Sequence, residues 1–225
     1  MSFNVLILGA TGLCGSAILK FAAKEPSFAT ILTITRREIK DSYDASKVKN
    51  VIAKSSDSWA DLIPKDVNIM FSGLATTMGE AGKDNFYKVD HDLNVELAKR
   101  AKSQGCSTYV LVSSVGANEN SSFYYMKTKG EIERDILALN FDKTIILRPG
   151  PLIGQRDKDK GFMNGLSAKL GQLLYKTRLQ RLLSYPASGE DVAKAGVKLA
   201  VDHSRTSKIQ IIESKEILEL ASEAA

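Results

Sequence analysis

Val5-Leu6-Ile7-Leu8 runs directly into Gly9-Ala10-Thr11-Gly12-Leu13-Cys14-Gly15 near the start of this chain. The apolar run predicts a β-strand, the glycines predict a tight turn, and the following residues, up to residue 24, predict a helix. Glycine allows the backbone to turn sharply and to approach a ligand closely, and the N–H groups at a helix start bind anions. We therefore expect a nucleotide phosphate at this turn, bound by Gly9, Thr11, Gly12, Leu13, Cys14 and Gly15.

The composition is that of one globular domain. The chain has 225 residues, of which 44% are hydrophobic and 25% charged, with five prolines, and this length suits a single full-sized core. Cys14 and Cys106 do not suggest a disulfide framework, so a reducing compartment is expected. No apolar run reaches the length of a transmembrane helix. Because the first strand begins at residue 3, we expect no cleaved presequence, which favours the cytosol, the nucleus or an organelle surface.

Short apolar runs alternate with helical segments along the chain. Runs that are continuously apolar predict strands covered on both faces, as in a parallel sheet with helices on each side. The expected strands span residues 4–8, 30–35, 48–53, 67–72, 108–113, 144–147 and 208–212. The expected helices span residues 13–24, 83–104, 124–139, 162–183 and 189–202, with a short one after Ser214. The sequence therefore predicts an α/β fold, namely a single doubly wound domain with a mostly parallel seven-stranded sheet and a small substrate-side portion over about residues 150–185.

Residues 156–181 form a basic amphipathic segment. They contain seven Lys and Arg residues against two Asp, and the resulting charge of +5 equals the net charge of the whole chain. A substrate-side helix with a solvated basic face and a helix bound to an anionic membrane both fit this pattern. Nucleic acid is not expected as a partner, because no recognition module is present and aromatic residues do not alternate with the basic ones.

Arg36 and Arg37 follow the second expected strand, where a domain specific for NAD carries an acidic residue for the ribose 2′-hydroxyl. A guanidinium binds phosphate through a planar fork, so this pair suits the 2′-phosphate of NADP. The two arginines therefore predict NADPH as the preferred cofactor over NADH. The small residues 72–77 after the fourth expected strand would let the backbone pass beside the nicotinamide ribose.

Tyr125 and Lys129 are four residues apart on an expected helix and therefore share one face. A tyrosine can protonate a carbonyl oxygen, but its ordinary pKa of about 10 is high for proton exchange near neutrality. A nearby ammonium favours the phenolate and can also bind the nicotinamide ribose. Ser113 and Ser114 end the strand before this helix, and one of their hydroxyls would hold the substrate oxygen. The predicted catalytic residues are Tyr125, Lys129 and Ser114, with Ser113 as the alternative serine.

Three other patterns receive less weight. Tyr43 and Lys47 repeat the tyrosine–lysine spacing, but no serine-ended strand precedes them, so we interpret this match as chance. The run Asp90-His91-Asp92 could form a metal or acid–base cluster, yet consecutive residues diverge around a helix, which favours a surface or packing role. Cys14, at a helix start, fits either a reactive thiol or a small buried apolar residue. We expect no metal site.

The order of these motifs resembles the atypical short-chain dehydrogenase/reductases. The strings GATGLCG (residues 9–15), LATT (74–77), KGEIERD (129–135) and ILRPGPLIG (146–154) are similar to a small fungal family of mitochondrial outer-membrane proteins, relatives of the animal Tat-interacting oxidoreductase-like protein. The resemblance implies a Rossmann fold that binds NADPH, with Tyr125 and Lys129 in the active site and Leu74, Ala75 and Arg148 lining the cofactor. Many relatives have an asparagine where this chain has Asp90, so a proton relay through that amide would be altered.

Two functions are consistent with these features. The first is an NADPH-dependent oxidoreductase that reduces a small carbonyl substrate. The alternative is a non-catalytic NADPH-binding protein that senses redox state or acts as a scaffold through protein partners, since the substrate-side portion is short. The resemblance also implies peripheral association with the cytosolic face of the mitochondrial outer membrane, and the basic segment 156–181 would make that contact.

Overall fold

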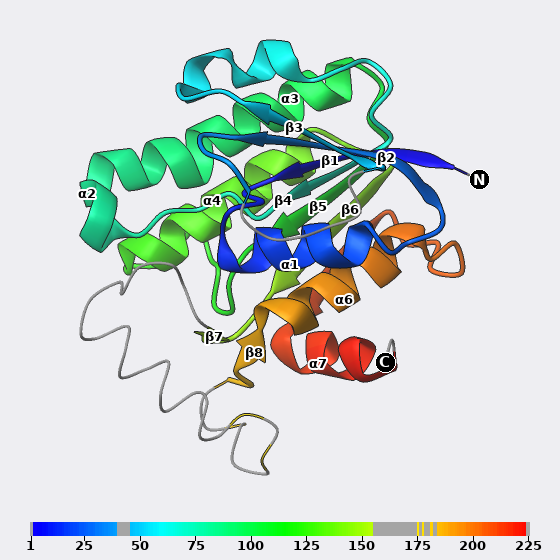
Figure 1. Cartoon of the computed structure of the whole chain (residues 1–225). Coiled ribbons are helices and arrows are strands. Elements are labelled where there is room, and N and C mark those ends of the chain that lie inside the picture. Colours follow the sequence, from blue (N-terminus) through cyan, green and yellow to red (C-terminus); the bar gives the residue numbers. More distant parts are fainter. Residues whose placement is uncertain are drawn as a thin grey trace.

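Seven parallel strands form the central sheet of the computed structural model, which describes residues 2–39, 46–154, 175, 177, 181 and 184–223 (Figure 1). The strand order is β3-β2-β1-β4-β5-β6-β9, and each neighbouring pair is parallel. The strands are β1 (Phe3–Leu8), β2 (Phe28–Thr35), β3 (Val48–Ile52), β4 (Ile69–Ser72), β5 (Thr108–Val112), β6 (Lys143–Arg148) and β9 (Ile209–Glu213). The predicted seven-stranded, doubly wound sheet is therefore confirmed.

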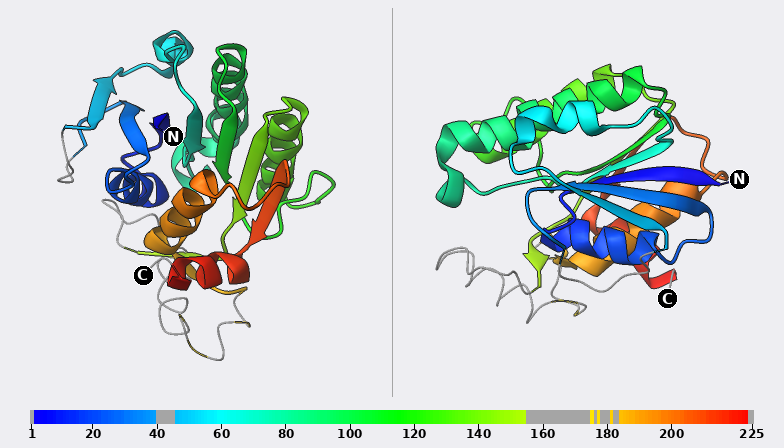
Figure 2. Two further views of the ribbon diagram at one scale, coloured as in Figure 1. Left: turned by 90° about the vertical axis from the view of Figure 1, so that its right-hand side faces the viewer. Right: turned by 45° about the horizontal axis from the view of Figure 1, so that its top comes forward.

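Helices cover both faces of the sheet (Figure 2). One face is covered by α1 (Leu13–Ala22), α6 (Gly189–Val201) and α7 (Ser214–Glu223), and the other by α3 (Asn94–Ser103) and α4 (Tyr124–Ala138). Alternate residues of a strand point to opposite faces. In β1, Val5 and Ile7 pack in the first layer, whereas Leu6 and Leu8 pack in the second. This explains why the strand reads as continuously apolar.

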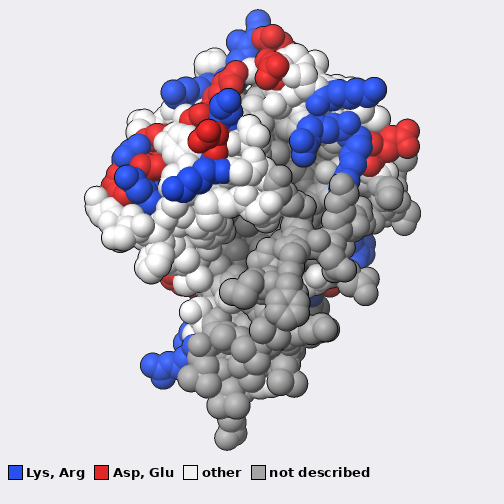
Figure 3. All heavy atoms as spheres, turned by 90° about the vertical axis from the view of Figure 1, so that its left-hand side faces the viewer, with Lys and Arg blue, Asp and Glu red and all other residues white. Residues whose placement is uncertain are grey.

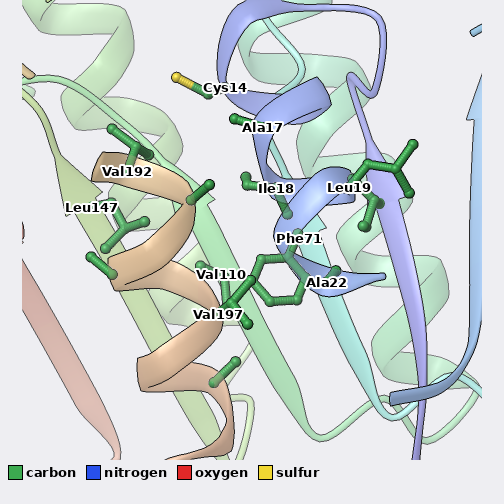
Figure 4. Close-up of a cluster of buried hydrophobic side chains, with 14 of the residues drawn as sticks. Cys14, Ala17, Ile18, Leu19, Ala22, Phe71, Val110, Leu147, Val192 and Val197 are labelled. Carbon is green, nitrogen blue, oxygen red and sulfur yellow. The ribbon is translucent and has the colours of Figure 1, made fainter. Parts of the chain in front are cut away.

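The first helix is held in place by a dense apolar cluster. Figure 4 shows side chains of α1 and α6 gathered over strands β4, β5 and β6. The helices contribute Ile18, Ala22, Val192 and Val197, and the strands contribute Phe71, Val110 and Leu147. Cys14 belongs to the same cluster and is 5% exposed, so it packs as a small buried residue. Because α1 starts at the glycine turn, this cluster also fixes the position of that turn.

The predicted helix over residues 83–104 is confirmed in its extent, because the backbone is helical from the residue after Gly82 to Ser103. Its regularity was not predicted correctly: the structure has α2 (Met78–Tyr87), a π-helical segment η2 (Lys88–Leu93) and then α3. Gly82, with φ of 74°, interrupts the helical conformation within α2. Periodicity cannot show such an irregularity, because the apolar spacing on either side of it remains helical.

Two small elements were not predicted. A 3₁₀-helix, η1 (Ser56–Leu62), buries Trp59 against the sheet, and its cap Ser55 accepts a hydrogen bond from the N–H of Asp57. A two-stranded parallel sheet pairs β7 (Leu152–Ile153) with β8 (Ala187–Ser188). Strands of two residues carry no periodic pattern that sequence reasoning could detect.

Several predictions fall on parts of the chain that are not described. The predicted helix over 162–183 and the basic segment 156–181 lie outside the described residues except for Tyr175, Thr177 and Arg181, and so does Tyr43. Among the helices in the described ranges, none combines the length and the apolarity needed to cross a lipid bilayer.

Candidate functional site

The predicted site residues lie at the carboxyl ends of the strands, along one edge of the sheet (Figure 1). β1 pairs with β2 on one side and with β4 on the other, so the chain builds the sheet first toward β3 and then, from β4 onward, in the opposite direction. In open parallel sheets, ligands bind in the crevice outside the carboxyl ends at such a switch point. The structure therefore brings the glycine turn after β1, the arginines after β2 and the serines after β5 to one edge.

The glycine turn is a place of close backbone approach. Gly9 has φ of +78°, a conformation that side chains rarely adopt, and a Cβ added there would lie 2.6 Å from the carbonyl carbon of Gly73. A Cβ at Gly15 would clash with the carbonyl oxygen of Gly9. The start of α1 therefore packs directly on the turn, and the turn packs on the exit of β4.

The start of α1 is open to an anion. Its N-cap, Gly12, has no side chain to bond the first amides, and the first turn, which the structure describes in full, contains no acidic residue. The N–H of Gly12 donates to the carbonyl of Gly9 at 2.8 Å, which closes the turn. The positive end of the helix dipole and the first N–H groups of α1 are thus positioned for a phosphate.

Arg36 and Arg37 are exposed just beyond the end of β2. The Nη2 of Arg37 donates to the carbonyl oxygen of Thr11 at 3.4 Å, which places this guanidinium beside the glycine turn. Figure 3 views the face that carries the strand ends, and its described surface is mostly basic on the side of β2 and β3, to the right. An anionic group next to the turn would meet this basic surface.

Tyr125 and Lys129 come together on α4. The Nζ of Lys129 lies 5.9 Å from the ring centroid of Tyr125, and the Tyr125 ring packs against Phe86 with centroids 5.7 Å apart. The Lys129 side chain is 5% exposed, whereas Tyr125 is half-buried and so remains accessible. The predicted pair therefore has the geometry of a buried cation beside an accessible phenol.

The buried Lys129 has a carboxylate partner that sequence reasoning did not assign. Its Nζ lies 2.8 Å from Oδ1 of Asp90, which is completely buried, and the Oδ2 of Asp90 accepts a hydrogen bond of 2.7 Å from the N–H of Thr76. Burial lowers the pKa of Lys129, but the interactions with Asp90 and Tyr125 outweigh it, so that this pKa lies above its ordinary value. Asp90 is therefore not a surface residue but part of the site.

The π-helical segment is tied to the end of β4. The side-chain amide of Asn94 donates to the carbonyls of Leu74 and Val89 at 3.2 and 3.0 Å, and its oxygen accepts a hydrogen bond from the hydroxyl of Ser72. Asn94 is completely buried. These bonds fix the backbone at Leu74, next to Ala75, and so shape the part of the site that follows β4.

The two candidate serines differ in their surroundings. Ser113 is 6% exposed and its hydroxyl donates to the carboxylate of Glu133. Ser114 is half-buried, and its hydroxyl donates to the carbonyl of Val115 at 3.3 Å. The hydroxyl of Ser113 is thus already bonded to a buried carboxylate. Ser114 is more exposed, which favours it as the serine that a substrate would reach.

Arg148, at the end of β6, is bound by two carboxylates. Its Nε donates to Glu133 at 3.0 Å and its Nη1 to Glu213 at 3.0 Å, and a further hydrogen bond joins its Nη2 to Glu133. Glu133 is buried and Arg148 is partly buried. The resemblance implied that Arg148 lines the cofactor, and the structure shows that its charge is neutralised by these two carboxylates.

Sequence reasoning did not single out Asn94 or Glu133, and it gave Asp90 a surface or packing role without pairing it with Lys129. Glu133 follows Lys129 by four residues and so lies on the same face of α4, a signal that was present in the spacing. Asp90 is buried within the π-helical η2 and Asn94 is buried at the start of α3, directly after it, and no spacing rule predicted this π-helical segment. Among the described residues, no group of three or more His, Cys, Asp or Glu side chains is placed to hold a metal ion.

The sheet order and the glycine turn between β1 and α1 define a Rossmann-type fold. A short-chain dehydrogenase family protein from Francisella tularensis superposes with a TM-score of 0.65 at 15% identity, over 96% of this chain and 99% of that one. MoeE5, solved with UDP-glucose and NAD, gives a TM-score of 0.69 at 14% identity, over 98% of this chain and 81% of that one. At identities this low, the similarity shows that the chains share a fold and nothing more specific.

Similarity in sequence shows the family. The chain is 51% identical over 222 residues to "Protein FMP52, mitochondrial" of Kluyveromyces lactis, covering 98% of this chain and 99% of that protein. A sequence model named HIM1 matches residues 44–185. The chain therefore belongs to the FMP52 family within the HIM1 group, in agreement with the resemblance found in its motifs.

Proposed function

We propose that this protein binds NADPH and uses it to reduce a small carbonyl compound. One observation carries the proposal: an uncapped glycine turn and a Tyr125–Lys129 pair lie along the same edge of one parallel sheet. The presence of NAD in MoeE5, whose fold is similar, supports a dinucleotide at this edge. In this proposal the turn residues, Leu74 and Ala75 contact the cofactor.

The preference for NADPH rests on Arg36 and Arg37. Both are exposed after β2, and Arg37 reaches the carbonyl of Thr11 in the glycine turn. A dinucleotide whose pyrophosphate lies at the turn extends its adenosine ribose toward the end of β2. The guanidiniums would there form charge-assisted hydrogen bonds with a 2′-phosphate, which NADH lacks.

The proposed chemistry divides between cofactor and protein. When bound, the dinucleotide supplies the hydride that is added to the carbonyl carbon. The hydroxyl of Ser114 holds the substrate oxygen, and the hydroxyl of Tyr125 donates its proton to that oxygen as the alcohol forms. Tyr125 is then reprotonated from solvent, which its half-buried position permits.

A titration of the purified protein with NADPH and, separately, with NADH tests the binding part of this proposal. Nicotinamide fluorescence reports the bound reduced cofactor directly, and no substrate needs to be known. We expect NADPH to bind at least about tenfold more tightly than NADH, because two guanidiniums would contact the additional phosphate. Failure of both cofactors to bind would overturn the proposal and leave a partner-binding role for the fold.

We also propose that the protein lies peripherally on the cytosolic face of the mitochondrial outer membrane. The relative from K. lactis carries the word mitochondrial in its name, and residues 156–181 hold the whole net positive charge of the chain. Flotation with anionic liposomes, comparing the native chain with a variant in which Lys169, Lys176, Arg178 and Arg181 are Gln, tests the contact. Equal flotation of both proteins would contradict an electrostatic attachment.

A further inference from the structure

Lys129 and Asp90 form a buried ion pair that joins α4 to η2. The side chains are 5% and 0% exposed, and the charged atoms are 2.8 Å apart. The second carboxylate oxygen of Asp90 is bound by the N–H of Thr76, in the segment that follows β4. Buried charges are retained when they are paired and hydrogen-bonded in this way. The pair therefore holds a fixed position between α4 and the segment that follows β4.

The other charges that face Lys129 are already engaged elsewhere. Glu133 contributes to the electrostatic environment of Lys129, but its two oxygens bind the guanidinium of Arg148. Arg148 in turn also binds Glu213. Tyr125 faces Lys129 through its ring. Asp90 is therefore the carboxylate that cancels the charge of Lys129.

This charge balance lies at the nicotinamide end of the proposed cofactor site. The phosphates of a dinucleotide lie at the glycine turn after β1, and its nicotinamide half extends toward the other side of the switch point. Thr76 follows β4, and Tyr125 and Lys129 lie on the helix that follows β5. The Lys129–Asp90 pair is therefore on the nicotinamide side.

We propose that Asp90 sets the relative affinity of this site for oxidised and reduced cofactor, an inference that rests on the proposed NADPH binding. The nicotinamide ring carries a positive charge when oxidised and none when reduced. An unpaired ammonium nearby would repel the oxidised ring and favour the reduced form. With Asp90 in place, the site presents a neutral pair and holds both forms with similar affinity. Asp90 is thus a positioning residue that acts through Lys129.

Calorimetric titration with NADP⁺ and with NADPH measures the ratio of the two dissociation constants, and needs no substrate. The comparison uses the wild-type protein, Asp90→Asn and Asp92→Asn. Asp92 is the matched control, because it lies on the same η2 segment and loses the same charge, but its side chain is 57% exposed. Mildly acidic buffer keeps Lys129 protonated, since a buried ammonium without its carboxylate loses its proton more readily.

In the wild-type protein and in Asp92→Asn, we expect the dissociation constants of NADP⁺ and NADPH to differ by no more than about threefold. In Asp90→Asn the NADP⁺ affinity should fall relative to that of NADPH by about tenfold, the order of magnitude expected when one unpaired charge of like sign faces the oxidised ring in a protein environment. A general loss of structure would weaken the binding of NADP⁺ and of NADPH equally. A change in the ratio of their dissociation constants therefore reports the charge effect and not a folding defect. Asp90→Glu, which restores the carboxylate, should return the ratio toward the wild-type value.

Three results would overturn the inference. If both forms bind but Asp90→Asn leaves the ratio unchanged, Asp90 has only a structural role, and the proposed NADPH binding stands. If Asp90→Asn does not fold, the test is the ratio of the NADP⁺ and NADPH dissociation constants of the wild-type protein. If the wild-type protein binds NADPH more than about tenfold more tightly than NADP⁺, the Lys129–Asp90 pair is not electrically neutral toward the nicotinamide ring. If neither form binds the wild-type protein, the proposed function fails together with this inference.

Discussion

The two ends of the candidate site are built in different ways. The phosphate end consists of backbone: Gly9, Gly12 and Gly15 bring a turn, a helix start and the exit of β4 into contact. The other end consists of buried side chains from α4, η2 and the segment after β4, with the Lys129–Asp90 pair at its centre. The first end has no room for a side chain at Gly9 or Gly15, whereas the second depends on a buried pair of opposite charges.

This difference explains which parts of the site a sequence motif reveals. A backbone turn is local, so its requirements appear as glycines at short spacing. A side-chain network joins residues that are 39 positions apart, as Lys129 and Asp90 are. The following predictions test whether the two ends respond to substitution as this comparison requires.

The largest effect is expected at the phosphate end. Gly15→Ala places a methyl group against the carbonyl oxygen of Gly9, and the backbone cannot move away from it easily. We expect a loss of about 3 kcal/mol or more in the free energy of unfolding, and no measurable NADPH binding. Thermal denaturation and fluorescence titration measure the two effects. Gly79→Ala is the control, because a Cβ there meets no described atom within 4 Å, and it should leave both properties nearly unchanged.

At the catalytic end, Tyr125→Phe should separate binding from turnover. The ring and its packing on Phe86 remain, but the proton donor is lost. We expect turnover of any accepted carbonyl compound to fall by about 100-fold to 10,000-fold, while NADPH affinity changes little. Steady-state kinetics with NADPH consumption measures the loss. Undiminished turnover in this variant would contradict the assignment of Tyr125.

A smaller effect is expected in the network behind the serines. Glu133→Gln leaves the partly buried Arg148 without its main carboxylate and also weakens the bond to Ser113. We expect a destabilisation of about 2 kcal/mol, less than for a completely buried pair because Arg148 is partly solvated. Urea denaturation measures it. Glu213→Gln removes the exposed partner of the same guanidinium and should cost at most about 0.5 kcal/mol.

The smallest effect is expected at the exposed arginines. Replacing both Arg36 and Arg37 by Gln should reduce the preference for NADPH over NADH by about tenfold at low salt, and by less at high salt, because exposed charges are screened. Cofactor titrations at two salt concentrations check this. Arg100→Gln, an exposed arginine on α3, should leave the preference unchanged. An unchanged preference in the double variant would place the 2′-phosphate elsewhere.

Most of the fold followed from the sequence because parallel strands that are buried on both faces read as uninterrupted apolar runs. The strands and the helices α1, α4, α6 and α7 were predicted with small differences in their ends. The interruption at Gly82, the π-helical η2 and the two-residue strands β7 and β8 were missed, since they change local geometry without changing the apolar pattern. These irregular segments lie next to the candidate site.

The sequence by itself determined the α/β class, the glycine turn and the pairing of Tyr125 with Lys129, because each depends on residues close together in the chain. Tertiary structure alone decided that Asp90 neutralises Lys129, that Glu133 holds both Ser113 and Arg148, and that Asn94 fixes the exit of β4. A buried charge or amide needs a partner, but any of several distant residues could supply it. Which one does so is known only once the helices are packed on the sheet.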